Sequence, residues 1–279
     1  MVTDSETNFT YLADSLPIMY PDFYKRFEKL LKECDIETAL LPDTKDVWAV
    51  DYMPIQIDKD KFVRFLYRPP YLTKDKILIK TISDVDSICA TIGISNVKSP
   101  ILVEGGNVTR CKNKVIMTQR VFKDNPTYER SPLIRELYKL LQIEDLYFIP
   151  EQPYDFTGHS DGMVRFFDEQ TLLINDYSKE SKSFQKAFEI AIHKTGLEYI
   201  KIPYNVYGNK NNDQAKGDYI NFLQVENTVI VPTFGLQDDD KVLGMFEKIF
   251  AGQSVKSIES NEIANEGGVL NCITWNIKK

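Results

Sequence analysis

One arrangement of strands and helices recurs along this 279-residue chain, and it constrains the fold more than any other feature of the sequence. Four segments each consist of an apolar run, a short polar turn and a second apolar run, which is the pattern of a β-hairpin. They are PIQIDKDKFVRFLY (54–67), NVTRCKNKVIMTQR (107–120), MVRFFDEQTLLIND (163–176) and INFLQVENTVIVPT (220–233). Their turns, at Asp60, Asn113, Glu169 and Asn227, are 53, 56 and 58 residues apart. This spacing predicts one structural unit repeated along the chain.

A helix-like stretch and one short apolar strand lie between successive hairpins, and another such pair precedes the first hairpin. The last hairpin is incomplete, because GVLNCITWNI (268–277) is followed by no second strand. A strand without a partner leaves an open sheet edge, so we expect ETNFTYLA (6–13) to pair with it. The sequence therefore predicts an α/β fold, a five-bladed pseudo-symmetric α/β propeller built from helix-strand-hairpin units, with residues 1–279 forming a single domain.

The net charge and the spacing of the cysteines limit the kinds of partner and the cellular location that we expect. The formal net charge is −7 and no segment is dense in Lys or Arg, which argues against a nucleic acid or an anionic membrane as the partner and favours a small cationic ligand. The four cysteines are far apart and form no CxxC pair, so we expect free thiols. The first residues are polar and acidic and no long apolar run follows, which favours the cytoplasm. The oligomeric state stays open.

Titratable residues stand at similar distances ahead of the predicted turns. Asp51, Glu104 and Asp218 each precede a turn by nine residues, and Cys272 occupies the corresponding place in the fifth unit. His159 and Asp161 precede the turn at Glu169 by ten and eight residues, and we expect them to face the same side of one strand. In a radial array of units these positions converge at the centre.

Four inward carboxylates with one imidazole and one thiol predict a cationic partner, because carboxylates are rarely buried unpaired. The mixed ligand types, spaced about fifty residues apart, match no zinc motif, and hard metals take oxygen ligands without a thiol. A planar guanidinium, which pairs with carboxylates through two hydrogen bonds, suits the set better. We therefore expect a guanidino ligand, with no metal and no cofactor.

Several segments resemble the agmatine deiminase and bacterial-type peptidylarginine deiminase family. They are WAVDYMP (48–54), EGGN (104–107), HSDGMVRF (159–166), GDYINFLQVENTVIVPTFGLQDDD (217–240) and NEGGVLNCIT (265–274). The resemblance implies the five-bladed pentein fold and hydrolysis of a guanidino group to a ureido group and ammonia. The substrate would be a small amine or an arginine-like compound, with agmatine the first candidate.

The resemblance also implies a role for each residue of the set. Cys272 would attack the guanidinium carbon and form a covalent thiouronium, while Asp51 and Asp161 clamp the guanidinium nitrogens. His159 would protonate the departing ammonia and then activate water, and Glu104 would orient and charge that imidazole. Such chemistry needs help for the thiol, because an unperturbed cysteine is only a few per cent thiolate at neutral pH.

The chain departs from the family pattern at several positions. Val50 and Met53 stand where the family has Arg and Gly, and Asn271 replaces a His before the nucleophile. The substrate therefore stays open, and so does the contribution of Trp48 and Asp218 to the pocket. Two alternatives also remain: an amidinotransferase, in which an amine resolves the thiouronium, and a non-catalytic pentein binding protein.

Overall fold

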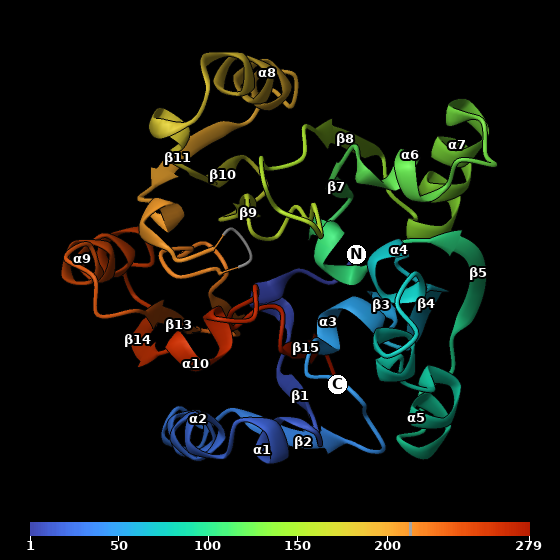
Figure 1. The fold of residues 1–279 in the computed structure, drawn as a ribbon, viewed down its shortest axis with the longest axis horizontal. Helices are drawn as coiled ribbons and strands as arrows, with labels where there is room; N and C mark the ends of the chain where they lie inside the picture. The colour runs from blue at the N-terminus through green and yellow to red at the C-terminus, as the bar shows by residue number, and fades with distance from the viewer. Residues whose placement is uncertain (212–213) are drawn as a thin grey trace.

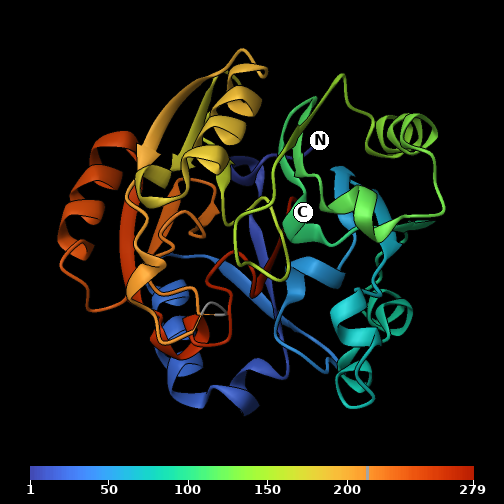
Figure 2. The same ribbon diagram turned by 45° about the horizontal axis from the view of Figure 1, so that its top comes forward.

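The computed structural model describes residues 1–211 and 214–279. Within these residues the strands form five three-stranded sheets of one design. Two strands make an antiparallel pair, and the third lies parallel to the middle strand. Figure 1 shows these sheets around a common centre, and Figure 2 shows the longer helices on the outside of the same arrangement.

The sheets follow the predicted hairpins. In order of pairing they contain β15 (Thr274–Ile277), β1 (Phe9–Ala13) and β2 (Glu37–Leu41); β3 (Ile55–Asp58), β4 (Lys61–Leu66) and β5 (Val97–Leu102); β6 (Thr109–Cys111), β7 (Lys114–Thr118) and β8 (Asp145–Ile149); β9 (Val164–Phe166), β10 (Thr171–Asn175) and β11 (Glu198–Ile202); β12 (Leu223–Val225), β13 (Thr228–Thr233) and β14 (Ser254–Glu259). All four predicted hairpins are confirmed.

The longer helices carry the chain from the second strand of each sheet to the third. They are α2 (Pro21–Glu33), α5 (Val85–Thr91), α7 (Arg130–Leu141), α8 (Lys182–His193) and α9 (Asp239–Ile249). Helix α8 illustrates why they form: Phe184, Phe188 and Ile192 repeat at helical spacing and are buried, and the Ser181 side chain accepts a hydrogen bond from the amide of Phe184. None of the described helices is long and apolar enough to cross a membrane.

Shorter helices lie in the connections. They are α1 (Leu16–Met19), α3 (Ala49–Tyr52), α4 (Pro70–Thr73), α6 (Arg120–Asp124) and α10 (Asn261–Ala264), with the 3₁₀ turns η1 (Asp4–Glu6), η2 (Leu78–Thr81), η3 (Gly105–Asn107), η4 (Tyr177–Lys179) and η5 (Val206–Gly208). Of these, α3 and η3 matter most for function, because both lie directly ahead of a hairpin on the side of the centre.

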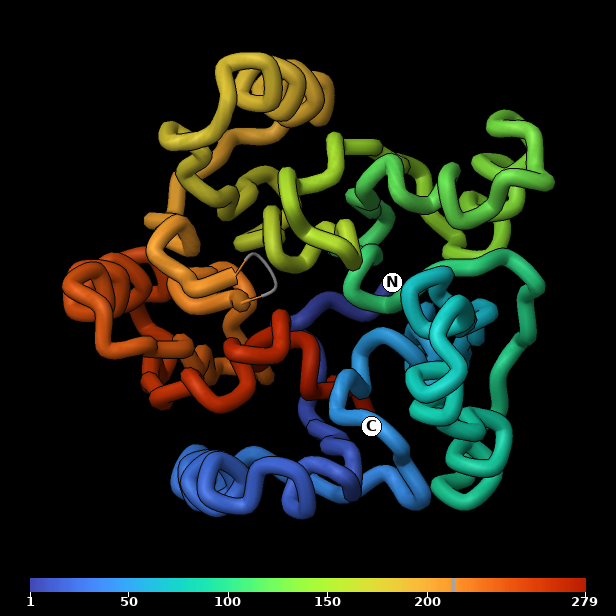
Figure 3. Tube along the Cα trace, in the orientation of Figure 1, coloured from blue at the N-terminus to red at the C-terminus, as the bar shows by residue number. Residues whose placement is uncertain are grey.

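The first and last parts of the chain share a sheet. Strand β1 pairs with β15, with Phe9 opposite Ile277 and Tyr11 opposite Trp275, and the trace in Figure 3 brings both termini near the centre of the view. The Thr10 hydroxyl adds a hydrogen bond of 2.9 Å to the side-chain oxygen of Asn276. The expected pairing of residues 6–13 with the last strand is therefore confirmed.

The strands that follow the candidate site residues are shorter than predicted. Strand β9 begins only at Val164, so His159 and Asp161 lie in a loop and a turn rather than on one side of a strand, and that expectation is wrong. The amide of Asp161 donates to the carbonyl of Gly106 at 3.0 Å, a bond to the preceding repeat unit instead of to a strand neighbour. Cys272 likewise lies in a turn, two residues before β15.

The seam between β1 and β15 gives a test of the fold. Tyr11 is 5% exposed and its ring centre lies 5.3 Å from that of Trp275. Tyr11→Ala is expected to lower the free energy of unfolding by about 3 kcal/mol, since it removes a buried aromatic ring and leaves a cavity. Tyr11→Phe, the control, is expected to cost less than about 1.5 kcal/mol because the ring is retained. Denaturant titration measures both, and equal small losses would contradict the role of this seam.

Candidate active site

A cavity of about 700 Å³ lies where the loops ahead of the hairpins meet. Its wall includes the acidic residues Asp46, Asp51, Asp155, Asp161, Glu180, Asp218 and Glu266, together with two lysines, Lys45 and Lys179. His159 and Cys272 belong to the same wall. A concave site with so many carboxylates attracts a positively charged ligand.

Asp51 is held by the loop of the next unit. It lies in α3, is buried, and its Oδ1 accepts a 2.9 Å hydrogen bond from the amide of Gly106. Two consecutive glycines make this contact possible. A β-carbon on Gly105 would lie 1.9 Å from the carbonyl oxygen of Val50, and one on Gly106 would lie 2.7 Å from Asp51 Oδ1. The EGG sequence therefore allows two loops to approach closely enough to place Asp51 in the site.

His159 lies between two carboxyl groups. Its Nδ1 is 3.5 Å from Asp51 Oδ1, and its Nε2 is 3.4 Å from Glu104 Oε2. Burial disfavours the charged imidazolium, but the negative charges of Asp51 and Glu104 outweigh it and hold the pKa of His159 well above its usual value. Among the described residues Nε2 has no hydrogen-bond partner of good geometry. The two carboxyl groups therefore favour the protonated, cationic form of the imidazole.

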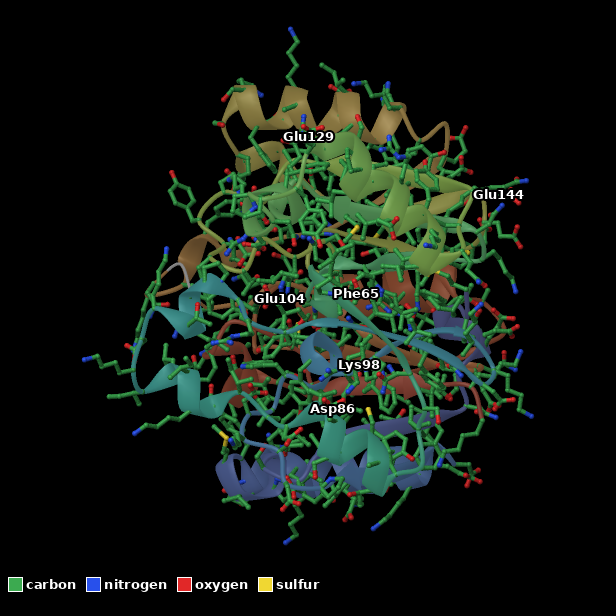
Figure 4. The ribbon with its side chains drawn as sticks, turned by 90° about the vertical axis from the view of Figure 1, so that its right-hand side faces the viewer. Phe65, Asp86, Lys98, Glu104, Glu129 and Glu144 are labelled. Atoms are coloured by element: carbon green, nitrogen blue, oxygen red, sulfur yellow. The ribbon has the colours of Figure 1, made fainter. Side chains whose placement is uncertain are left out.

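Glu104 is buried and is the second residue after the end of β5. In Figure 4 the label of Glu104 lies near the middle of the view, and that of Glu144 lies at its edge. The hydroxyl of Tyr71, which lies in α4, donates to Glu104 Oε2, the oxygen that also lies near His159. This hydrogen bond orients the carboxyl group toward the imidazole.

The Cys272 thiol lies beside Asp161. The Sγ atom is 3.6 Å from Asp161 Oδ2 and accepts a hydrogen bond of 3.2 Å from the side-chain amide of Asn221. Burial, with the nearby charges of Asp161 and Asp51, raises the pKa of Cys272 well above its usual value. In the empty cavity the thiol is therefore protonated, and a cation is needed beside it to favour the thiolate.

Asp161 is fixed by two side-chain amides. Asn271 Nδ2 donates to its Oδ2 at 2.7 Å, and Asn221 Nδ2 lies 3.3 Å from the same oxygen. Burial raises the pKa of Asp161, while the positive charge of His159 opposes that effect. Asn271 replaces the family's histidine, and here it serves as a hydrogen-bond donor that orients Asp161.

One group of residues has the donor atoms for a metal ion. The ligand atoms of Asp51, Glu104 and His159 all lie within 4.8 Å of one another. The same three side chains can lie this close together without a metal ion, because a protonated His159 supplies the positive charge between two carboxylates. The absence of a metal from the reaction stays a prediction, tested below.

The residues that the sequence singled out come together as expected. Asp51, His159, Asp161, Asp218 and Cys272 all line the cavity. Glu104 reaches it through His159. Trp48 belongs to the wall as well, and it packs so closely on Gly268 that a β-carbon there would lie 2.4 Å from its ring. Arg165 has a structural role, since it pairs with Asp4 and donates to the carbonyl of Phe222.

Two contributors were missed by the sequence argument. Asn221 contacts both Cys272 and Asp161, and it follows Asp218 by three residues. A search of the repeat positions for hydrogen-bonding as well as titratable residues could have found it. Tyr71 lies in the connection between β4 and α5. No repeat position or residue pattern pointed to it.

Known structures share this fold. The structure of C. jejuni agmatine deiminase superimposes with a TM-score of 0.81 at 18% identity, covering 100% of this chain and 95% of that one. A dimethylarginine dimethylaminohydrolase (DDAH) from Pseudomonas aeruginosa matches with a TM-score of 0.59 at 13% identity over 97% of this chain and 99% of that one. The α/β architecture of small sheets is therefore that of these proteins.

Sequence comparison identifies relatives directly. A provisionally named agmatine deiminase of Photobacterium profundum is 23% identical over 229 residues, covering 69% of this chain. The chain spans 62% of the length of that relative. The family model for the Porphyromonas-type peptidyl-arginine deiminases matches residues 15–277, which include every residue of the site described above. The chain therefore belongs to the Porphyromonas-type peptidyl-arginine deiminase family.

Proposed function

We propose that this protein is a guanidine deiminase, a hydrolase that converts a guanidino group to a ureido group and ammonia. The observation that carries the proposal is the placement of the Cys272 thiol 3.6 Å from Asp161, in one cavity with the charged pair of His159 and Glu104. Agmatine is the first candidate substrate. A relative is named for it, and a substrate-bound agmatine deiminase from C. jejuni has the same fold, with a TM-score of 0.82.

Substrate binding prepares the nucleophile. The guanidinium lies between Asp51 and Asp161, and its positive charge offsets the burial that raises both their pKa values. The same charge beside Cys272 favours release of the thiol proton to solvent. The thiolate then attacks the guanidinium carbon, and a C–S bond forms as the π electrons move to nitrogen.

His159 supplies the proton for the leaving group. The tetrahedral adduct collapses, the C–N bond breaks, and the departing nitrogen takes the proton from the imidazolium and leaves as ammonia. The neutral imidazole then removes a proton from water, whose oxygen attacks the thiouronium carbon. The C–S bond breaks, the ureido product leaves, and the cysteine and imidazolium are restored. Asp51 and Glu104 keep the imidazole basic enough for both steps.

The finer architecture and location belong to the same proposal. We infer that the five sheets are the blades of a pseudo-symmetric propeller and that residues 1–279 act as one domain, with the reaction on its axis. Support comes from the shared strand pattern and the ring of sheets in Figure 1. The four unpaired thiols fit a reducing cytoplasm.

Turnover tests the proposed reaction. Wild-type protein incubated with agmatine, arginine or an arginine-containing peptide is expected to release ammonia and a ureido product from at least one of them. Cys272→Ser is expected to lower kcat by at least about 10⁴-fold, because the nucleophile is lost. Cys34→Ser, which changes a partly exposed thiol at the end of α2, is the control and is expected to leave the rate unchanged.

Two further outcomes of that assay separate the alternatives. Dialysis against EDTA is expected to leave the rate unchanged; loss of activity restored by a divalent ion would contradict the metal-free mechanism. A product that forms only when an amine acceptor is added, with no release of ammonia in the absence of that acceptor, would indicate an amidinotransferase. No product from any substrate, with unaltered folding, would favour the binding-protein alternative.

The cation dependence of the thiolate gives a labelling prediction. Chloroacetamidine, which is cationic, is expected to alkylate Cys272 at least about tenfold faster than neutral chloroacetamide at pH 7, because the carboxylates bind it and its charge favours the thiolate. Cys34, which lies outside the cavity, is expected to react with the two reagents at similar rates. Mass spectrometry of the labelled peptides measures both, and equal rates at Cys272 would contradict the mechanism.

The buried carboxyl groups predict a pH dependence of stability. Burial, countered in part by His159, raises the pKa of Asp51 from 3.8 to about 8 in the substrate-free protein. Between these values the folded protein keeps a proton that the unfolded chain has lost, so this stabilisation is present at acidic pH and is lost as the pH rises toward 8. The Tm should fall over that interval, and the fall should be smaller in Asp51→Asn. Parallel Tm curves would show that Asp51 does not cause it.

A further inference from the structure

Asp218 is a cavity residue to which the reaction steps above assign no role. It is 8% exposed and lies in the turn ahead of β12, where its amide donates to the carbonyl of Ala215 at 3.0 Å. Its Oδ2 faces Gly162, where a β-carbon would lie only 3.1 Å away. Because Gly162 directly follows Asp161, the carboxyl group of Asp218 borders the loop that carries this clamp residue, on the wall of the same cavity.

The carboxyl group of Asp218 has no compensating charge. Its Oδ1 is buried and has no hydrogen-bond partner among the described residues, and none of the described ion pairs includes Asp218. Lys179 lines the same cavity, but its ammonium donates to Asn205 at 3.0 Å. Burial and the nearby charge of Asp161 raise the pKa of Asp218 well above its usual value. A buried carboxyl group in this state gains free energy when a cation binds beside it.

Tyrosine side chains share the cavity wall with Asp218. Tyr204 forms a backbone bridge with Asp218 and lines the cavity, and its ring centre is 5.7 Å from that of Tyr207. An acidic group beside tyrosine rings suits an alkylammonium ion, whose methylene groups pack on the rings while its charged end meets the carboxylate.

We infer that Asp218 determines specificity by binding a second positive group, an ammonium at the far end of the guanidino substrate. The inference rests on the proposed deiminase function and deepens it. Two separate acidic positions, the clamp and Asp218, select a compound with two cationic ends joined by an apolar stem. A tail that ends in a carboxylate would instead be repelled by Asp218 and desolvated next to it.

A matched pair of substrates tests this inference. Agmatine ends in an ammonium, and n-pentylguanidine has a methyl group in that place with nearly the same shape. Wild-type protein is expected to use agmatine with a kcat/KM at least about tenfold higher, the value of a charge-assisted hydrogen bond in a cavity. Asp218→Asn is expected to remove this preference through a higher KM for agmatine, and to leave pentylguanidine within about twofold of wild type.

Glu169→Gln is the control variant, because Glu169 is an exposed acidic residue between β9 and β10 and does not belong to the cavity wall. It is expected to change kcat/KM for agmatine by less than about threefold, as exposed charges are screened by water and salt. Equal use of both substrates by the wild type, or an equal loss with both in Asp218→Asn, would overturn the inference and leave the deiminase function intact. Turnover of neither substrate would overturn both. The wild-type comparison needs no variant, so it decides even if Asp218→Asn fails to fold.

Discussion

Several carboxyl groups share a desolvated space with a single imidazole, and the remainder of the site depends on this charge imbalance. Asp51 and Glu104 are countered by His159 at close range, whereas Asp161 accepts from two side-chain amides and the Cys272 thiol, and Asp218 has an unpartnered oxygen. Such an arrangement opposes folding, since like charges repel and burial removes their water. A scaffold of contacts between repeat units holds these groups in place, and a cationic ligand would supply the missing positive charge.

That scaffold is a set of backbone contacts between neighbouring repeat units. Gly106 donates to Asp51 through its amide and accepts from the amide of Asp161 through its carbonyl, so one residue ties three loops together. The carbonyl of Cys272 accepts from the amide of Val50 at 3.4 Å. Val50 therefore meets the site through its backbone, and replacing the family's arginine there leaves this contact in place.

Much of this arrangement could be predicted from the sequence, because each repeat unit has a similar pattern of apolar and polar residues. Alternating apolar residues define the hairpins, and equal spacing brings Asp51, Glu104 and Asp218 to equivalent places. The pattern fails where strands end. The apolar pattern of the third hairpin begins at Met163 and suggests a strand that includes Asp161. The amide of Asp161 instead bonds to the neighbouring loop, and no periodicity in the sequence encodes a bond between units. Tyr71 could not be found at all, since it comes from a connection that the other units do not repeat.

The pairing of β1 with β15 has a consequence for the order of assembly during synthesis. Strand β1 is the middle strand of its sheet, yet its partner β15 leaves the ribosome only after more than 250 further residues. The first sheet therefore waits, half formed, while the other four can fold as they emerge. Cys272 lies two residues before β15, so the thiol takes its place only when this final pairing closes. Every other described residue of the cavity wall precedes Cys272 in the chain, so the thiol is the last part of the wall to be synthesised and the last to be positioned.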